Sequence, residues 1–228
     1  MSLVSALLLS SVPIGILLWI GRRDHWTRQH SRRSLLDDCI PLFDRYELTH
    51  GDDNFPRLSG RSGTRKIDIR LLSDTMTIRR LPQLWLQVTV LEHLPDVSGF
   101  AILVRPSGYD FYSLTAGFHH VIEPPPSLPQ EILARGEDAR SVRLFEKLAP
   151  TLASILSDPL VKEIAVTSKG LRIIRQNAEG RRGDYLLLRQ AVFDDAMVSA
   201  ETLATTLEQI QALRDDAVTP ARGVKEPV

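Results

Sequence analysis

Two adjacent histidines, His119 and His120, are the residues that most suggest a metal ligand or a catalytic base. Imidazole nitrogens bind transition metals and exchange protons near neutral pH. Neighbouring residues on an extended segment point to opposite faces, so the two rings would not converge on one ion. The nearest following acid is Glu123, and the sequence contains no His-x-His or His-x₃-His spacing. We therefore expect one histidine to pack inside and the other to face solvent.

Asp52, Asp53 and Asn54 could supply oxygen ligands to a calcium ion. A calcium loop alternates its ligands along the chain and closes with a glutamate, whereas Phe55-Pro56 interrupts any such register. Short polar residues also favour turns, because their side chains bond to the local backbone. The segment is therefore predicted to be a turn.

Glycines, hydroxyls and cations gather in residues 60–66 (GRSGTRK), as they do in phosphate-binding loops. A P-loop separates its glycines by four residues and opens a helix whose N-terminus holds the anion. Here the segment leads into a strand pattern, so we expect a turn with solvated cations. The basic pairs Arg79-Arg80 and Arg181-Arg182 are also expected on turns or strand ends, where they could rest on anionic lipid.

Cys39 is the only cysteine, which excludes an intramolecular disulfide and a site built from several thiolates. Its neighbours Ile40 and Leu42 favour the role of a small apolar filler, and a palmitoylated thiol is the alternative. The sequence also lacks a Gly-x-Ser-x-Gly elbow for a serine nucleophile. On these grounds we predict no cofactor and no metal, and the balance leans against catalysis.

The overall composition is that of an ordinary globular protein. Of the 228 residues, 43% are apolar and 25% are charged, and 28 basic side chains balance 28 acidic ones. Nucleic-acid-binding domains generally carry a basic excess, so no nucleic-acid partner is expected.

Residues 3–20 (LVSALLLSSVPIGILLWI) contain no charged side chain. As a helix they would span about 27 Å, close to the hydrocarbon thickness of about 30 Å. No basic residue precedes this run and no small-x-small cleavage site follows it, which argues against a cleaved signal peptide. We therefore predict a single-pass transmembrane anchor at residues 1–21, with a cleaved signal or a buried hairpin helix as the alternatives.

A cluster of arginines follows this segment, within a predicted basic juxtamembrane helix at residues 22–41. The cluster comprises Arg22, Arg23, Arg28, Arg32 and Arg33. Because positively charged flanks stay on the cytoplasmic side, we predict that the N-terminus lies outside and the soluble domain in the cytoplasm. The arginines would contact anionic headgroups, so membrane lipids are the expected partners of the anchor.

The rest of the chain is predicted to be a soluble α+β domain at residues 42–215, with a mainly antiparallel sheet and two packed helices. Its β-rich part, residues 42–122, alternates apolar and polar side chains in the manner of half-buried strands. The predicted strands are 46–49, 65–71, 84–91, 99–105 and an irregular one within 109–122. Most of 41–64 is predicted to be turn, because glycine, proline and aspartate are frequent there.

A proline-rich seam at residues 123–129 separates this part from residues 130–215, which are predicted to be α-β-β-β-α. The expected elements are a helix at 138–156 that Pro150 kinks or breaks, strands at 161–167, 171–176 and 185–191, and a helix at 200–213 capped by Ser199. Strands in hairpin runs favour an antiparallel α+β fold over a doubly wound one, in one sheet or two. Residues 216–228 are predicted to be a disordered tail.

These observations predict a non-catalytic accessory or interaction domain, tethered to the cytoplasmic face of the membrane and binding a protein partner whose identity stays open. A tether raises the local concentration of a membrane partner. The candidate contact surface comprises Tyr109, Phe111 and Tyr112, because aromatic side chains are enriched at interfaces, although core packing is their competing role. The alternatives are a tethered enzyme acting on a membrane or envelope substrate, and a domain that senses lipid or nucleotide.

Overall fold

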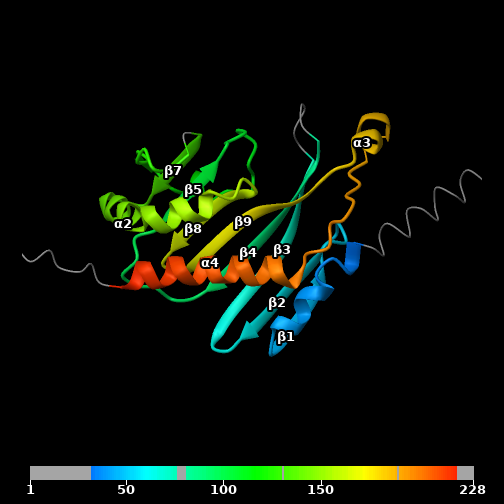
Figure 1. Ribbon diagram of the computed structural model, residues 1–228, viewed down its shortest axis with the longest axis horizontal. Helices are drawn as coiled ribbons and strands as arrows, with labels where there is room; N and C mark the ends of the chain where they lie inside the picture. The colour runs from blue at the N-terminus through cyan, green and yellow to red at the C-terminus, as the bar shows by residue number, and fades with distance from the viewer. Residues whose placement is uncertain (1–31, 76–80, 130, 189, 220–228) are drawn as a thin grey trace, which may run out of the picture.

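The computed structural model describes residues 32–75, 81–129, 131–188 and 190–219 (Figure 1). The predicted anchor at residues 1–21 lies outside these residues, as do Arg22, Arg23 and Arg28 of the arginine cluster. Among the described residues, no helix is both long and apolar enough to cross a bilayer.

One antiparallel sheet of nine strands organises the described chain. Its spatial order is β1-β2-β3-β4-β9-β8-β5-β7-β6, so the β8–β9 hairpin lies between β4 and β5. The strands are β1 (Arg45–His50), β2 (Pro56–Ser62), β3 (Arg65–Asp74), β4 (Gln83–Leu91), β5 (Phe100–Val104), β6 (His120–Ile122), β7 (Ile132–Gly136), β8 (Val161–Thr167) and β9 (Gly170–Glu179).

Two long helices, α2 (Ala139–Leu156) and α4 (Ala200–Val218), cover one face of the sheet and contact each other (Figure 1). A short helix, α3 (Arg182–Leu188), projects away from this layer at the upper right of Figure 1. Two 3₁₀ helices, η1 (Asp37–Leu42) and η2 (Leu114–Gly117), complete the regular elements of the described chain. The mainly antiparallel α+β fold predicted from the sequence is therefore confirmed.

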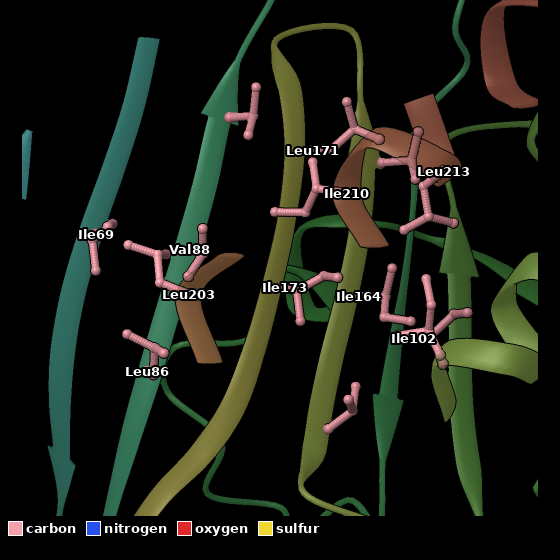
Figure 2. Close-up of a cluster of buried hydrophobic side chains, with 14 of the residues drawn as sticks. Ile69, Leu86, Val88, Ile102, Ile164, Leu171, Ile173, Leu203, Ile210 and Leu213 are labelled. Carbon is pink, nitrogen blue, oxygen red and sulfur yellow. The ribbon is translucent and has the colours of Figure 1, made fainter. Parts of the chain in front are cut away.

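The core lies between the helical layer and the sheet. Ile69 of β3, Val88 of β4 and Ile173 of β9 belong to the same buried cluster as Leu203 and Ile210 of α4 (Figure 2). All five side chains are almost completely buried. Burying one such aliphatic side chain contributes about 1.5–3 kcal/mol, so this layer is the main source of stability.

Both long helices are capped at their N-termini; the cap at Ser199 was predicted from the sequence, and the cap at Asp138 was not. Asp138 Oδ1 accepts from the backbone N–H groups of Arg140 and Ser141, and the Ser141 hydroxyl accepts from the backbone N–H of Asp138. Ser199 Oγ accepts from the backbone N–H of Thr202 at 3.1 Å. These bonds satisfy N–H groups that a helix N-terminus leaves unpaired.

Pro150 does not break α2, contrary to the break that the sequence allowed. The helix runs from Ala139 to Leu156 with Pro150 inside it. Leu148 and Leu152, on either side of the proline, are completely buried. Their packing offsets the hydrogen bond that proline cannot donate.

Two strands escape the sequence pattern, β2 and β7. Residues 41–64 were predicted to be mostly turn, because Pro56 and Gly60 are common turn residues. Pro56 is tolerated as the first residue of a strand. Gly60 is required within β2 because a Cβ atom there would lie 2.5 Å from Cδ1 of the Phe43 ring. Tertiary contacts therefore override the local preference for a turn.

Three further predictions, about the type or the extent of an element, are wrong. A strand was predicted at 185–191, but residues 185–188 belong to α3, because β9 already continues to Glu179 and leucine is a good helix former. Residues 216–218 of the predicted tail are helical, since α4 extends to Val218. Within the predicted juxtamembrane helix, residues 34–36 form turns and η1 runs past Pro41, whose fixed φ suits a tight turn.

Candidate interaction site

The face of the sheet opposite the helices is polar at its centre, and one segment folds over it. We call residues 105–118, which follow β5, the cover loop. The sequence predicted an irregular strand within 109–122, but only His120–Ile122 of that segment is a strand. The cover loop is held in place by charged side chains of β8 and β9 instead of strand pairing.

A β-bulge in β8 places Lys162 where it forms the first set of contacts that hold the cover loop. The register of β8 against β9 shifts just before Glu163, so Lys162 is an extra residue in the strand. Lys162 Nζ donates to the backbone oxygens of Val104 at 2.9 Å and Arg105 at 2.7 Å, and lies 3.1 Å from Asp110 Oδ1. The Lys162 and Asp110 side chains are only 4% and 5% exposed, so this ion pair depends on those extra hydrogen bonds.

Asp110 is bound on several sides. Its Oδ2 accepts from the backbone N–H of Ser107 at 2.7 Å, and its Oδ1 accepts from Tyr112 Oη at 3.2 Å. Burial alone would raise the pKa of Asp110, but the bond from Ser107 and the charge of Lys162 outweigh it and hold the pKa below its usual value. The carboxylate therefore stays ionised and fixes the middle of the cover loop.

Glu163 and Arg172 form the second set of contacts that hold the cover loop. Arg172 Nη2 donates to Glu163 Oε1 and, at 3.0 Å, to the backbone oxygen of Tyr112. Glu163 Oε2 accepts from the backbone N–H of Leu114 at 3.1 Å. The Glu163 side chain is fully buried, and burial raises its pKa more than the charge of Arg172 lowers it. This network joins β8, β9 and the cover loop.

The three aromatic residues of the candidate contact surface differ in exposure. Tyr109 and Phe111 are 63% and 60% exposed, whereas Tyr112 is buried against Trp85, with ring centroids 5.7 Å apart. The Phe111 ring meets the Tyr112 ring edge-on, at 5.2 Å. Of the three residues in the candidate contact surface, two therefore reach the surface and the third anchors them.

Two cavities border the cover loop. The first, of about 250 Å³, is lined by Trp85, Lys162 and Asp110 among other polar residues. The second, of about 320 Å³, lies between Leu114 and the arginines of β2 and β3. Their central ionisable groups already pair with one another, which suits binding better than proton transfer.

His119 and His120 are both exposed, so the expectation that one packs inside is wrong. They lie at and beside β6, a three-residue edge strand whose Val121 is also 62% exposed. A strand this short at the edge buries little. In the described part of the chain, His, Cys, Asp and Glu side chains nowhere gather in groups of three or more that could hold a metal ion.

The remaining polar motifs have local roles. Asp53 Oδ1 accepts from the backbone N–H of Phe55 at 3.1 Å, and Asn54 has a φ of 62°, which confirms the predicted turn. Arg181 is paired with Asp184 and Asp194 and is therefore not a free cation for lipid.

Arg32 and Arg33, the two described members of the arginine cluster, also make local bonds. Arg32 Nη2 donates to the backbone oxygen of Ala191 at 2.9 Å, and its guanidinium lies 5.0 Å from the centre of the Phe55 ring. Arg33 Nη2 donates to Asn54 Oδ1 at 3.2 Å. Both side chains therefore help to fix the start of the described chain.

Cys39 lies in the core. Its thiol donates to the backbone oxygen of Val198 at 3.4 Å. Burial, with a smaller contribution from Asp38, raises the pKa of the thiol to about 12. A buried, protonated thiol fits the role of apolar filler and opposes lipid modification.

Comparison with known proteins adds one structure. No protein-family model matches the chain, and no curated protein does. A crystal structure of the mycobacterial trehalose monomycolate transport factor A, TtfA, is similar with a TM-score of 0.44 and 8% sequence identity, over 84% of this chain and 100% of that one. A likeness this weak carries no functional argument, so the function is inferred from the site alone.

Proposed function

We propose that this protein is a membrane-anchored, non-catalytic interaction protein that binds a protein partner through Tyr109 and Phe111. The observation that carries the proposal is an exposed aromatic pair on a loop fixed by two buried ion pairs. Aromatic side chains supply a large share of binding energy at protein interfaces. A loop that is already ordered loses little conformational entropy on binding, so its contacts convert more fully into affinity.

The anchor and the orientation belong to the same proposal. Their support is the uncharged run at residues 3–20 and the arginines that follow it. The described domain would then stand on the cytoplasmic side, where its lone cysteine needs no disulfide partner.

The orientation predicts opposite behaviour of two reporters fused to the C-terminus of the full-length chain in bacterial cells. A fluorescent protein is expected to glow and alkaline phosphatase to be inactive, because phosphatase folds only outside the cytoplasm. Exchanging the five arginines for glutamine is expected to weaken this preference. Active phosphatase together with a dark fluorescent fusion would contradict the orientation.

Photocrosslinking tests the contact surface. A photoreactive residue at position 109 or 111 of the full-length chain is expected to form the same discrete adduct in cells. The matched control is position 186, because Leu186 is 55% exposed on α3, away from the cover loop. Phe111→Ser is expected to weaken binding by about 30-fold and to reduce the adduct at position 109 accordingly. Equal adducts at all three positions, or none, would refute the proposed surface.

A further inference from the structure

A second feature of the open sheet face is a set of five cations on β1, β2 and β3. We call this set the basic face; it comprises Arg45, Arg57, Arg61, Lys66 and Arg70. The strand register places Arg61 directly opposite both Arg45 and Lys66, and Arg57 directly opposite Arg70. The alternating residues Leu58, Ile67 and Ile69 are buried in the helix-covered core, so the cations point to the other side.

A buried carboxylate positions two of these cations. Asp68 Oδ1 accepts from Arg57 Nε and Ser59 Oγ, and Asp68 Oδ2 accepts from Arg70 Nε, each at 2.8 Å. Burial alone would raise the pKa of Asp68, but these bonds outweigh it and lower the pKa. One ionised carboxylate neutralises one guanidinium, so the trio keeps a net positive charge. The side chains of Arg57 and Arg70 remain 46% and 42% exposed.

The other three cations of the basic face have no acidic partner in the described part of the chain that offsets their charge. Arg45, Arg61 and Lys66 are exposed, and none forms an ion pair with an acidic side chain of the described residues. Like charges directly opposite on neighbouring strands destabilise a sheet. Charged residues do protect the edges of sheets, but Arg61 and Lys66 lie on the inner strands β2 and β3. Edge protection therefore does not explain these two cations.

We propose that the basic face binds the anionic headgroups of a lipid bilayer. Neighbouring strands lie about 4.8 Å apart, so the cations form a closely spaced array that suits a continuous anionic surface. On β1–β3 the acids of this face are Glu47, Asp68 and Asp74, so the five cations remain in excess. Nucleic acid is the less favoured polyanion, because the positions of β1–β3 that share this side carry no aromatic ring for base stacking and the whole chain has no net charge. The proposal rests on the membrane anchor of the proposed function.

Vesicle flotation tests this binding while the predicted anchor is embedded in a separate bilayer, so that it cannot insert into the vesicles. The full-length chain is reconstituted into phosphatidylcholine nanodiscs and mixed with vesicles of phosphatidylcholine alone or with one quarter phosphatidylglycerol. The discs are expected to float with the anionic vesicles only, and to be released by 0.5 M sodium chloride because salt screens the contact (about 4 Å screening length). Empty nanodiscs serve as the blank.

Two matched double variants locate the binding. Arg61→Gln/Lys66→Gln is expected to weaken binding by about 25-fold, since each cation near the surface contributes about fivefold. Arg143→Gln/Lys147→Gln removes the same charge from exposed positions on α2, on the helix-covered side, and is expected to bind like the unaltered chain. An equal loss in both variants would overturn the assignment to the basic face.

The remaining outcomes separate this inference from the proposed function. A chain that fails to enter nanodiscs would contradict the anchor. A chain that enters them but floats equally with neutral and anionic vesicles would overturn the lipid site alone. Release from anionic vesicles by a single-stranded oligonucleotide of equal charge would reassign the face to nucleic acid and also overturn the lipid site.

Discussion

Replacing Arg172 with methionine is expected to lower the free energy of unfolding by about 3–5 kcal/mol, because it leaves a buried carboxylate without its partner. Glu163 is fully buried, and Arg172 Nη2 bonds both to it and to the backbone oxygen of Tyr112. The change removes a charge and also one attachment of the cover loop. Chemical denaturation of the full-length chain in detergent, followed by tryptophan fluorescence, measures the effect.

The double variant Glu163→Gln/Arg172→Met is the control for the ion pair. Removing both charges is expected to recover much of the loss, since a buried pair is often nearly neutral relative to uncharged residues. A double variant no more stable than the single one would show that packing, and not the stranded charge, accounts for the loss.

The same single variant should acquire a pH dependence. Burial already raises the pKa of Glu163, and without Arg172 only the hydrogen bonds from Ser113 and Leu114 oppose that effect. A raised pKa means that the folded chain binds the proton more tightly than the unfolded chain. Protonation of Glu163 then stabilises the fold fully below the pKa of an unfolded glutamate, about 4.3. This stabilisation is lost as pH rises through the folded pKa of Glu163. Arg172→Met should therefore be less destabilised in acid, and a pH-independent difference would contradict this mechanism.

Phe145→Ala is the second change with a large expected effect, about 3–5 kcal/mol. Phe145 lies on α2, is completely buried, and meets the Phe100 ring of β5 edge-on with centroids 5.4 Å apart. The substitution removes apolar burial and leaves a cavity between helix and sheet. Thermal and denaturant unfolding measure the loss.

Glu146→Ala is the matched control for Phe145→Ala, because Glu146 is the next residue of α2 and is exposed. It is expected to change the free energy of unfolding by no more than about 0.5 kcal/mol. Similar losses in the two variants would mean that α2 itself, and not its buried contact, is the sensitive feature.

The local sequence pattern predicts secondary structure correctly where tertiary contacts favour the same structure. In residues 84–91 the alternating Leu86 and Val88 enter the core, and the strand is found as expected. At Gly60 the local preference is a turn, yet a strand forms because only glycine fits beside Phe43. At residues 185–191 the apolar residues fit strand or helix, and the extent of β9 decides between them.

The site was only partly predictable, because the contacts that hold the cover loop join residues that are distant in sequence. The hydrogen bond from Leu114 to Glu163 spans 49 positions, and the one from Arg172 to Tyr112 spans 60. The sequence did contain one signal, the adjacent charges Lys162-Glu163 inside an otherwise apolar strand. Charges in such a place require buried partners. The basic face could not be predicted from the net charge of the chain, because only the strand register brings its five cations together.

The insertion of the β8–β9 hairpin between β4 and β5 has a consequence for biosynthesis. Strands β1 to β4 leave the ribosome early and can pair as a meander, but one edge, β4, must wait for β9. Until residue 179 is made, the nascent chain holds two sheet fragments with unpaired edges, the kind of template on which aggregation begins. The centre of the sheet is thus its last part to be synthesised, and non-local closure of this kind slows folding. The long polar-faced meander has to remain soluble during that interval, a constraint that acts on the chain before any partner or membrane does.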